Sequence, residues 1–109
     1  MQSNKSFLQL LLSNNDKRQQ NGLMQTISLE QLNVLGEIFY NLLNIVPLDK
    51  KEEKIVKKKK KILQKLSLLS KSYNSRRKLL LANKSALLKT LLSFKDKLLH
   101  VINSLPLLS

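Results

Sequence analysis

Apolar residues recur along most of the chain at spacings of three and four residues, which is the repeat of an amphipathic helix. The clearest such segment starts at Ser28, which fits a capping box together with Gln31. Its apolar positions are Leu32, Leu35, Phe39, Leu42 and Val46, joined by Ile38 and Leu43. Pro47 cannot continue a helix, so we expect this segment to end there and to form the centre of the core.

The same pattern predicts further helices over residues 6–12, 16–26, 49–69, 76–82 and 86–104, separated by polar turns. Asp16, Asp49 and Ser85 are suited to cap three of them, and Leu23 and Met24 should be buried. A chain of 109 residues with two glycines and two prolines fits one helical domain. We therefore expect an all-α fold, a compact bundle of about five short helices, with helix-turn-helix-like corners at residues 11–24 and 68–81.

The segment from Asp49 to Lys65 differs from the others because five consecutive lysines, Lys57 to Lys61, interrupt its apolar pattern. On a helix of about 3.6 residues per turn, one face carries Ile55, Ile62, Leu66 and Leu69. The opposite face carries Glu53, Lys57, Lys60, Lys61 and Gln64, while Lys58, Lys59 and Lys65 flank the apolar stripe. The sequence predicts a helix that docks through one face and presents lysines to solvent on the rest.

The charge is concentrated in the second half of the chain. Residues 1–49 carry three basic and four acidic side chains, whereas residues 50–97 carry 17 basic and three acidic ones. A net charge of +13 on a folded domain implies a polyanionic partner, because self-repulsion otherwise lowers stability. Nucleic acid and an anionic membrane are the two main candidates.

No motif typical of a catalytic or metal site is present in the sequence. The chain has no cysteine, so disulfides and thiolate ligands are excluded. The single histidine, His100, lies among apolar residues, where a helix-surface or core-edge role suits it better than catalysis. Glu52 and Glu53 fit the first turn of the basic helix, where they favour the macrodipole. We expect a protein that is not an enzyme and requires no metal or cofactor.

Three interpretations fit the lysine run: a solvated surface, a phosphate-binding face, and a nuclear localisation signal at Lys57–Lys61. The excess of positive charge is larger than solubility requires. Lysines contact phosphates as point charges and do not read bases. The few aromatic residues are not interleaved with the lysines, which argues against stacking on single-stranded bases. These points favour low-specificity binding to double-stranded DNA, and a localisation signal is compatible with it.

The last predicted helix offers a different function. Its wide apolar surface consists of Leu87, Leu88, Leu91, Leu92, Phe94, Leu98, Leu99 and Ile102. Basic amphipathic helices of this kind lie on anionic membranes. A small bundle also needs a strongly apolar helix to close its core, and we favour that role. Charged residues interrupt the segment, so we do not expect it to span a membrane.

The order of features resembles small basic proteins encoded by Maverick/Polinton-type transposons and adintoviruses, in which an apolar segment precedes a lysine-rich helix and a basic leucine helix. The matching positions are Glu37, Asn41, Leu42, Pro47, Leu48, the lysines between 50 and 65, and residues 76–81. A Gly-Gly-Phe tail common in that family is replaced here by Ala82-Asn83-Lys84-Ser85. The resemblance implies a viral or transposon accessory protein, such as a virion core component that packs DNA. It would act in the nucleus of an infected or host cell, or in the virion interior.

We therefore expect a non-enzymatic protein that binds or condenses DNA through its phosphate backbone. The predicted contacts are Lys54, Lys57, Lys58, Lys60, Lys61, Lys65, Lys71, Arg76, Arg77 and Lys78. The last three would open a short helix after a polar turn, where a helix-turn-helix protein faces DNA. The alternatives are a membrane-active or capsid-bridging helical protein and an adaptor for an acidic protein partner. Homo-oligomers are compatible with all three.

Overall fold

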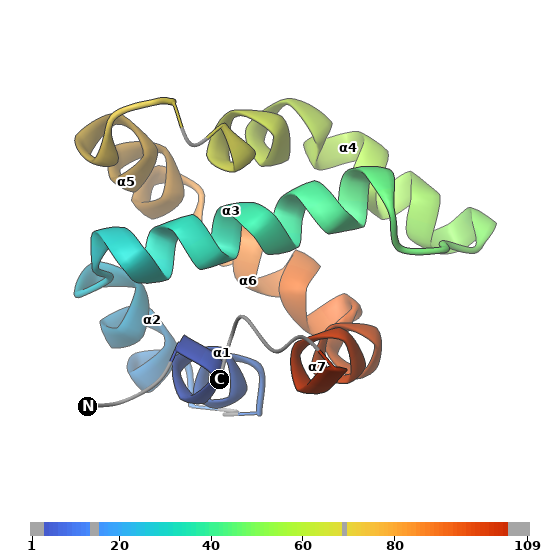
Figure 1. The fold of residues 1–109 in the computed structure, drawn as a ribbon, viewed down its shortest axis with the longest axis horizontal. Coiled ribbons are helices and arrows are strands. Elements are labelled where there is room, and N and C mark those ends of the chain that lie inside the picture. Colours follow the sequence, from blue (N-terminus) through green and yellow to red (C-terminus); the bar gives the residue numbers. More distant parts are fainter. Residues whose placement is uncertain (1–3, 14–15, 69, 105–109) are drawn as a thin grey trace.

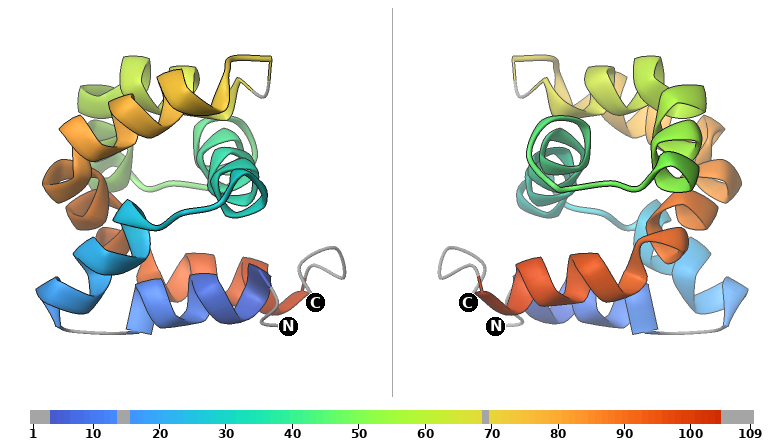
Figure 2. Two further views of the ribbon diagram at one scale, coloured as in Figure 1. Left: turned by 90° about the vertical axis from the view of Figure 1, so that its left-hand side faces the viewer. Right: turned by 90° about the vertical axis from the view of Figure 1, so that its right-hand side faces the viewer.

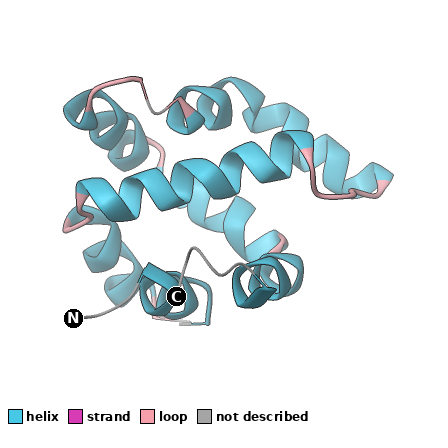
Figure 3. Cartoon of the chain, viewed as in Figure 1, coloured by secondary structure: helices cyan, strands magenta, loops and turns pink. Residues whose placement is uncertain are grey.

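The computed structural model describes residues 4–13, 16–68 and 70–104. Within these ranges the chain forms seven helices and no strand (Figure 3). The helices are α1 (Asn4–Ser13), α2 (Lys17–Gln25), α3 (Leu29–Asn44), α4 (Lys50–Ser67), α5 (Tyr73–Ala82), α6 (Lys84–Ser93) and α7 (Lys95–Ser104). The predicted all-α bundle is confirmed, although it has seven helices among the described residues rather than about five.

Helix α3 crosses the centre of the molecule (Figure 1) and contacts α1, α4 and α5. Figure 2 shows α1 and α7 running side by side on the far side of the bundle from α4 and α5. The predicted capping box starts α3: Ser28 Oγ accepts a hydrogen bond from the Gln31 N–H at 3.1 Å, and Gln31 Oε1 accepts one from the Ser28 N–H at 3.0 Å. The helix ends at Asn44, shortly before Pro47.

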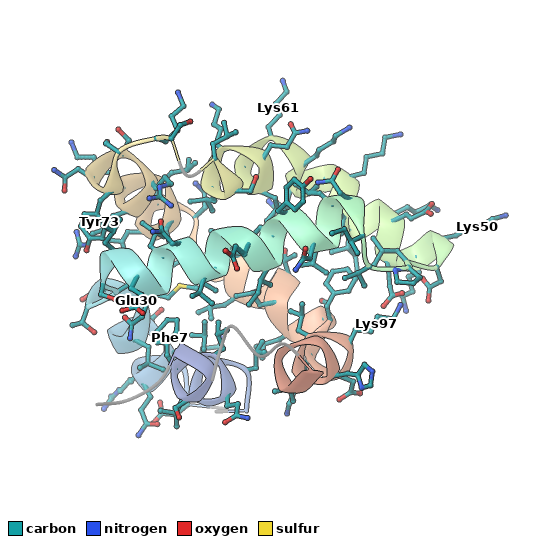
Figure 4. All side chains as sticks on the ribbon, in the orientation of Figure 1. Phe7, Glu30, Lys50, Lys61, Tyr73 and Lys97 are labelled. Atoms are coloured by element: carbon teal, nitrogen blue, oxygen red, sulfur yellow. The ribbon has the colours of Figure 1, made fainter. Side chains whose placement is uncertain are left out.

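The core is built around α3, and every helix contributes to it. One fully buried side chain from each helix in turn is Phe7, Met24, Leu35, Leu63, Leu80, Leu91 and Leu98. Figure 4 shows Phe7 pointing from α1 toward α3. The apolar positions predicted for α3 are buried, except that Leu43 and Val46 are partly buried at its edge. Because full burial of a leucine is worth about 1.5–3 kcal/mol, this shared core holds the short helices together.

The single helix predicted over residues 86–104 is wrong, because the chain bends at Phe94 and forms α6 and α7. Phe94 has φ −110° and ψ 17°, and its N–H donates to the carbonyls of Leu91 and Leu92. No proline or glycine marks this position, so the break has no local signal in the sequence. The bend buries Phe94 and brings α7 beside α1, which a straight helix would not achieve.

Three other helices start earlier than predicted, and the first is α1, which begins at Asn4 instead of Ser6. Helix α5 begins at Tyr73 instead of Arg76, because the Ser72 hydroxyl caps it by accepting a hydrogen bond from the Ser75 N–H at 3.1 Å. Helix α6 begins at Lys84 and has Asn83 at its cap position, so the predicted capping role of Ser85 is wrong. The Asn83 side chain instead donates to the Leu79 carbonyl in the preceding helix, at 2.9 Å.

A lysine on α7 fastens it to the turn between α3 and α4. Lys97 Nζ donates to the Pro47 carbonyl at 2.9 Å and forms an ion pair with Glu52 in the first turn of α4. Figure 4 shows Lys97 extending from α7 toward this turn. The side chains are 40% and 17% exposed, respectively, so the pair is only partly shielded from solvent.

Candidate nucleic-acid interface

Helix α4 begins with a complete capping box. Asp49 Oδ1 accepts a hydrogen bond from the Glu52 N–H at 2.8 Å, and Glu52 Oε1 accepts one from the Asp49 N–H at 3.1 Å. The predicted cap at Asp49 is confirmed. Glu52 and Glu53 lie in the first turn and Lys65 in the last, an arrangement that complements the helix macrodipole.

The apolar face of α4 is wider than the predicted stripe. Leu66 is buried as expected, and Ile55 and Ile62 are partly buried. Val56 and Leu63, which the prediction left out, are buried more deeply than the two isoleucines. The long contact between α4 and α3 accounts for this shift, because it covers the side of the helix next to the stripe. Leu69 lies outside the described residues.

The opposite side of α4 carries exposed lysines from its first residue onward, and we call the six that follow its first turn the lysine face. They are Lys54, Lys57, Lys58, Lys60, Lys61 and Lys65. On an ideal helix they occupy an arc of about 160° and a length of about 16 Å. Figure 4 shows Lys61 pointing away from the bundle. The exposed positions of Glu53, Lys57, Lys60, Lys61 and Gln64 are as the helical pattern predicted.

A groove between α4 and α6 extends the positive surface beyond the lysine face. It has a volume of about 490 Å³ and is lined by Ile55, Lys58, Lys59, Ser85, Ala86, Lys89, Thr90 and Ser93. Lys59 is half-buried here instead of flanking the apolar stripe in solvent, and Lys89 comes from a separate helix. Sequence reasoning did not select either lysine as a contact. The spacing of Lys59 from Ile55 and Leu63, four residues each way, was the available signal for its inward position.

The four predicted contacts after α4 have different environments. Lys71 is exposed in the turn before α5, and Lys78 is exposed on α5 itself. Arg77 is half-buried, and its Nη2 donates to the Gln25 carbonyl at 2.6 Å. Arg76 is only 3% exposed, so it does not belong to the open cationic surface. The structure therefore places Lys71 beside Lys65 at the end of α4, with Arg76 buried in the pocket that they line, and it holds Arg77 against another segment.

Helix α5 is held in place by hydrogen bonds to the last residue of α2 and to the segment that follows it. Tyr73 Oη donates to the Ile27 carbonyl at 2.6 Å, and Arg77 provides the second bond next to it. Figure 4 shows Tyr73 at the end of α5 that faces this segment. Tyr73 and Arg77 thus connect α5 to a distant part of the chain. The basic, polar sequence around them did not indicate this structural role.

The apolar surface predicted for the last helix is largely taken up by the core. Leu87, Leu88, Leu91, Phe94 and Leu98 are buried, while Leu92 is 38% exposed. None of the helices in the described ranges is long and apolar enough to cross a bilayer. The same part of the chain contains no cluster of three or more histidine or acidic side chains suited to a metal ion.

Comparison with known proteins gave no match: no family model, no curated protein and no solved structure is similar to this chain. The resemblance to transposon and adintovirus proteins therefore stays a prediction. The functional argument depends on the lysine face, the adjacent groove and the charges around them.

Proposed function

We propose that the protein binds double-stranded nucleic acid, most readily DNA, through its phosphate backbone and with little sequence specificity. The observation that carries this proposal is the lysine face of α4. Six exposed ammonium groups lie on one side of a helix whose other side is fixed in the core. No acidic residue occurs in the sequence between Glu53 and Asp96, and Glu53 itself lies at the start of this surface, where it lines a pocket with Lys57 and Lys60.

The dimensions of the lysine face suit a DNA strand. Phosphates on one strand advance by about 3.4 Å per nucleotide, so a face about 16 Å long spans about five of them. Lysine side chains reach phosphates as flexible point charges, which gives affinity without base discrimination. Lys71 lies beside Lys65 at the end of α4, Lys78 is exposed on α5, and both would extend the contact past the helix.

A role in packing DNA inside a virion or a transposon particle, as the resemblance implies, would use this same surface. Binding without sequence preference allows many copies to cover one duplex, and each copy neutralises part of its charge. The nucleus of a host cell or the virion interior would be the place of action. This part of the proposal predicts that excess protein compacts long DNA.

The salt dependence of duplex binding tests the proposal directly. We would titrate a random-sequence duplex of about 20 base pairs by fluorescence anisotropy over a series of NaCl concentrations. Engagement of five or six phosphates should give a slope of log affinity against log salt of about −5. The triple variant K54Q/K57Q/K61Q should have a shallower slope of about −2 to −3, because each lost phosphate contact lowers the magnitude of the slope by about 0.9.

The matched control removes the same amount of charge from elsewhere. K17Q/R18Q/K95Q also lowers the net charge by three, but it leaves the lysine face intact. If the two triple variants lowered the affinity for the duplex equally, binding would depend on the total charge alone, and the assignment to α4 would be overturned. Anionic vesicles serve as competitor: if they remove the protein from the duplex at moderate salt, the membrane alternative replaces DNA binding.

A further inference from the structure

The guanidinium of Arg76 is one of two buried side-chain groups with an unpartnered polar atom among the described residues, and it is the charged one. The residue is 3% exposed. Its Nη1 is buried from solvent, and it has no hydrogen-bond partner among the described residues. Its Nε donates to the Lys71 carbonyl at 3.2 Å. A buried arginine normally pairs with a carboxylate, because an uncompensated buried charge is costly.

Arg76 lines a small pocket between the end of α4 and the start of α5. The pocket has a volume of about 250 Å³ and is also lined by Lys65, Lys71, Ser75 and Leu79. No acidic residue among those described lines the pocket beside its three basic side chains. Water could satisfy the free N–H of Arg76, but only an anion would offset the three positive charges.

The hydrogen bonds at the start of α5 leave a further donor in this pocket. Ser72 Oγ accepts from the Ser75 N–H at 3.1 Å and donates to Ser75 Oγ at 2.9 Å. The Ser75 hydroxyl proton is therefore available to a ligand. Ser75 also lies in the first turn of a helix of ten residues, where the positive end of the helix dipole favours negative charge.

We propose that this pocket binds a phosphate group, held by Arg76 and Ser75 inside and by Lys65 and Lys71 at the mouth. Arginine and hydroxyl donors match the several acceptor oxygens of a phosphate, and the lysines add charge. The volume lies below the usual range of about 300–1,000 Å³ for pockets of drug-sized ligands, so the pocket holds the phosphate group, and any molecule attached to that group stays outside. Lys65 and Lys71 are exposed, so they can swing aside to admit it.

Inorganic phosphate is the first probe, because it tests the pocket without any nucleic acid. We would follow the unfolding temperature as phosphate replaces chloride at constant ionic strength. At ten times Kd, binding should raise Tm by about 5 °C, and Tm should then continue to rise with the logarithm of the phosphate concentration. Acetate at the same ionic strength is the comparison, and an equal rise in acetate would indicate a carboxylate site in place of a phosphate site.

Arg76→Met is the decisive variant, because it keeps the length and the apolar stem while removing the charge. It should abolish the rise with phosphate, and its Tm without phosphate should equal or exceed that of the wild type. Lys71→Gln and Ser75→Ala alter exposed residues that should not affect folding, and each should weaken phosphate binding about tenfold. They keep the test decisive if Arg76→Met fails to fold.

Lys51→Gln is the matched control for Lys71→Gln, since Lys51 is exposed on α4 outside the pocket. It should leave phosphate binding unchanged. An equal loss in both lysine variants, or a full phosphate response in Arg76→Met, would overturn the proposal. Two sources can supply the phosphate group, a nucleic-acid end or a free small phosphate.

A 5′-phosphorylated short duplex and its 5′-hydroxyl counterpart, compared at high salt, separate these sources. Tighter binding of the phosphorylated form, lost in Arg76→Met, would assign the pocket to nucleic-acid ends. Equal binding of the two forms would leave small phosphates as the ligand. Because the phosphate titration needs no DNA and avoids changing Lys65, its failure leaves the duplex experiment on α4 unaffected.

Discussion

Neighbouring residues of the same type can have opposite environments in this protein. Arg76 is buried against a pocket, Arg77 donates to the backbone of another segment, and Lys78 extends into solvent. Their positions around α5 explain the difference, because consecutive residues on a helix point about 100° apart. A basic tripeptide is therefore no single contact site, and each side chain needs its own functional test.

Gly22 gives a prediction at the same scale. It is exposed in α2, and a Cβ added to it would meet no heavy atom within 4 Å apart from its chain neighbours and the backbone of its own helix. No glycine among the described residues has a positive φ. Gly22→Ala should therefore raise the free energy of unfolding by about 0.5–1 kcal/mol, because alanine loses less backbone entropy in a helix. Urea denaturation measures this change. A decrease in stability would contradict the open space around this position.

Among the helices, polar contacts fix the position of elements that packing alone would leave free to slide. Lys97 joins α7 both to the Pro47 carbonyl and to Glu52 in the first turn of α4. The contact links the C-terminal helices to the helix that carries the lysine face. Because Lys97 is bound to the α3–α4 turn, it stabilises the fold and does not belong to the proposed DNA surface.

A double-mutant cycle on this pair measures its contribution. Lys97→Met alone should lower the free energy of unfolding by about 1 kcal/mol, since it removes one hydrogen bond and a partly exposed ion pair. Glu52→Gln keeps an oxygen for the capping box and removes the charge. The coupling energy between the two changes should be about 0.5 kcal/mol. If the two changes in the free energy of unfolding were strictly additive, the ion pair would contribute nothing, and Lys97 would stabilise the fold through its bond to Pro47 alone.

At the scale of the whole molecule, the net charge of +13 opposes the compact state. The molecule measures 37 × 28 × 27 Å. At about 20 mM salt the Debye length is about 20 Å, so charges on different helices still repel one another, whereas at about 0.3 M it falls to about 6 Å. The same repulsion would be relieved by a bound polyanion, which links stability to the proposed function.

Stability should therefore rise with salt. We expect Tm to increase by several degrees between about 20 mM and 0.3 M NaCl, because screening weakens the repulsion between lysines. The K54Q/K57Q/K61Q variant should have a smaller increase and a higher Tm at low salt. Differential scanning calorimetry provides the measurement. A Tm that does not change with salt would show that the positive charges are already too far apart to affect folding.

The sequence alone determined the features that depend on neighbouring residues along one helix. The capping boxes at Ser28 and Asp49, the core face of α3 and the outward direction of the lysines all follow from helical periodicity and local hydrogen bonding. These features define the all-α fold and most of the lysine face. They are predictable because every group involved lies within a few residues of its partner.

Only the tertiary structure decided which surfaces meet. Three features have no distinct local signal: the bend at Phe94, the burial of Arg76 and the anchoring of Arg77 to Gln25. Each depends on helices that come together from distant parts of the chain, and the free energy of burying apolar surface selects that arrangement. The pocket at Arg76 exists for the same reason, since its walls come from α4, the following turn and α5.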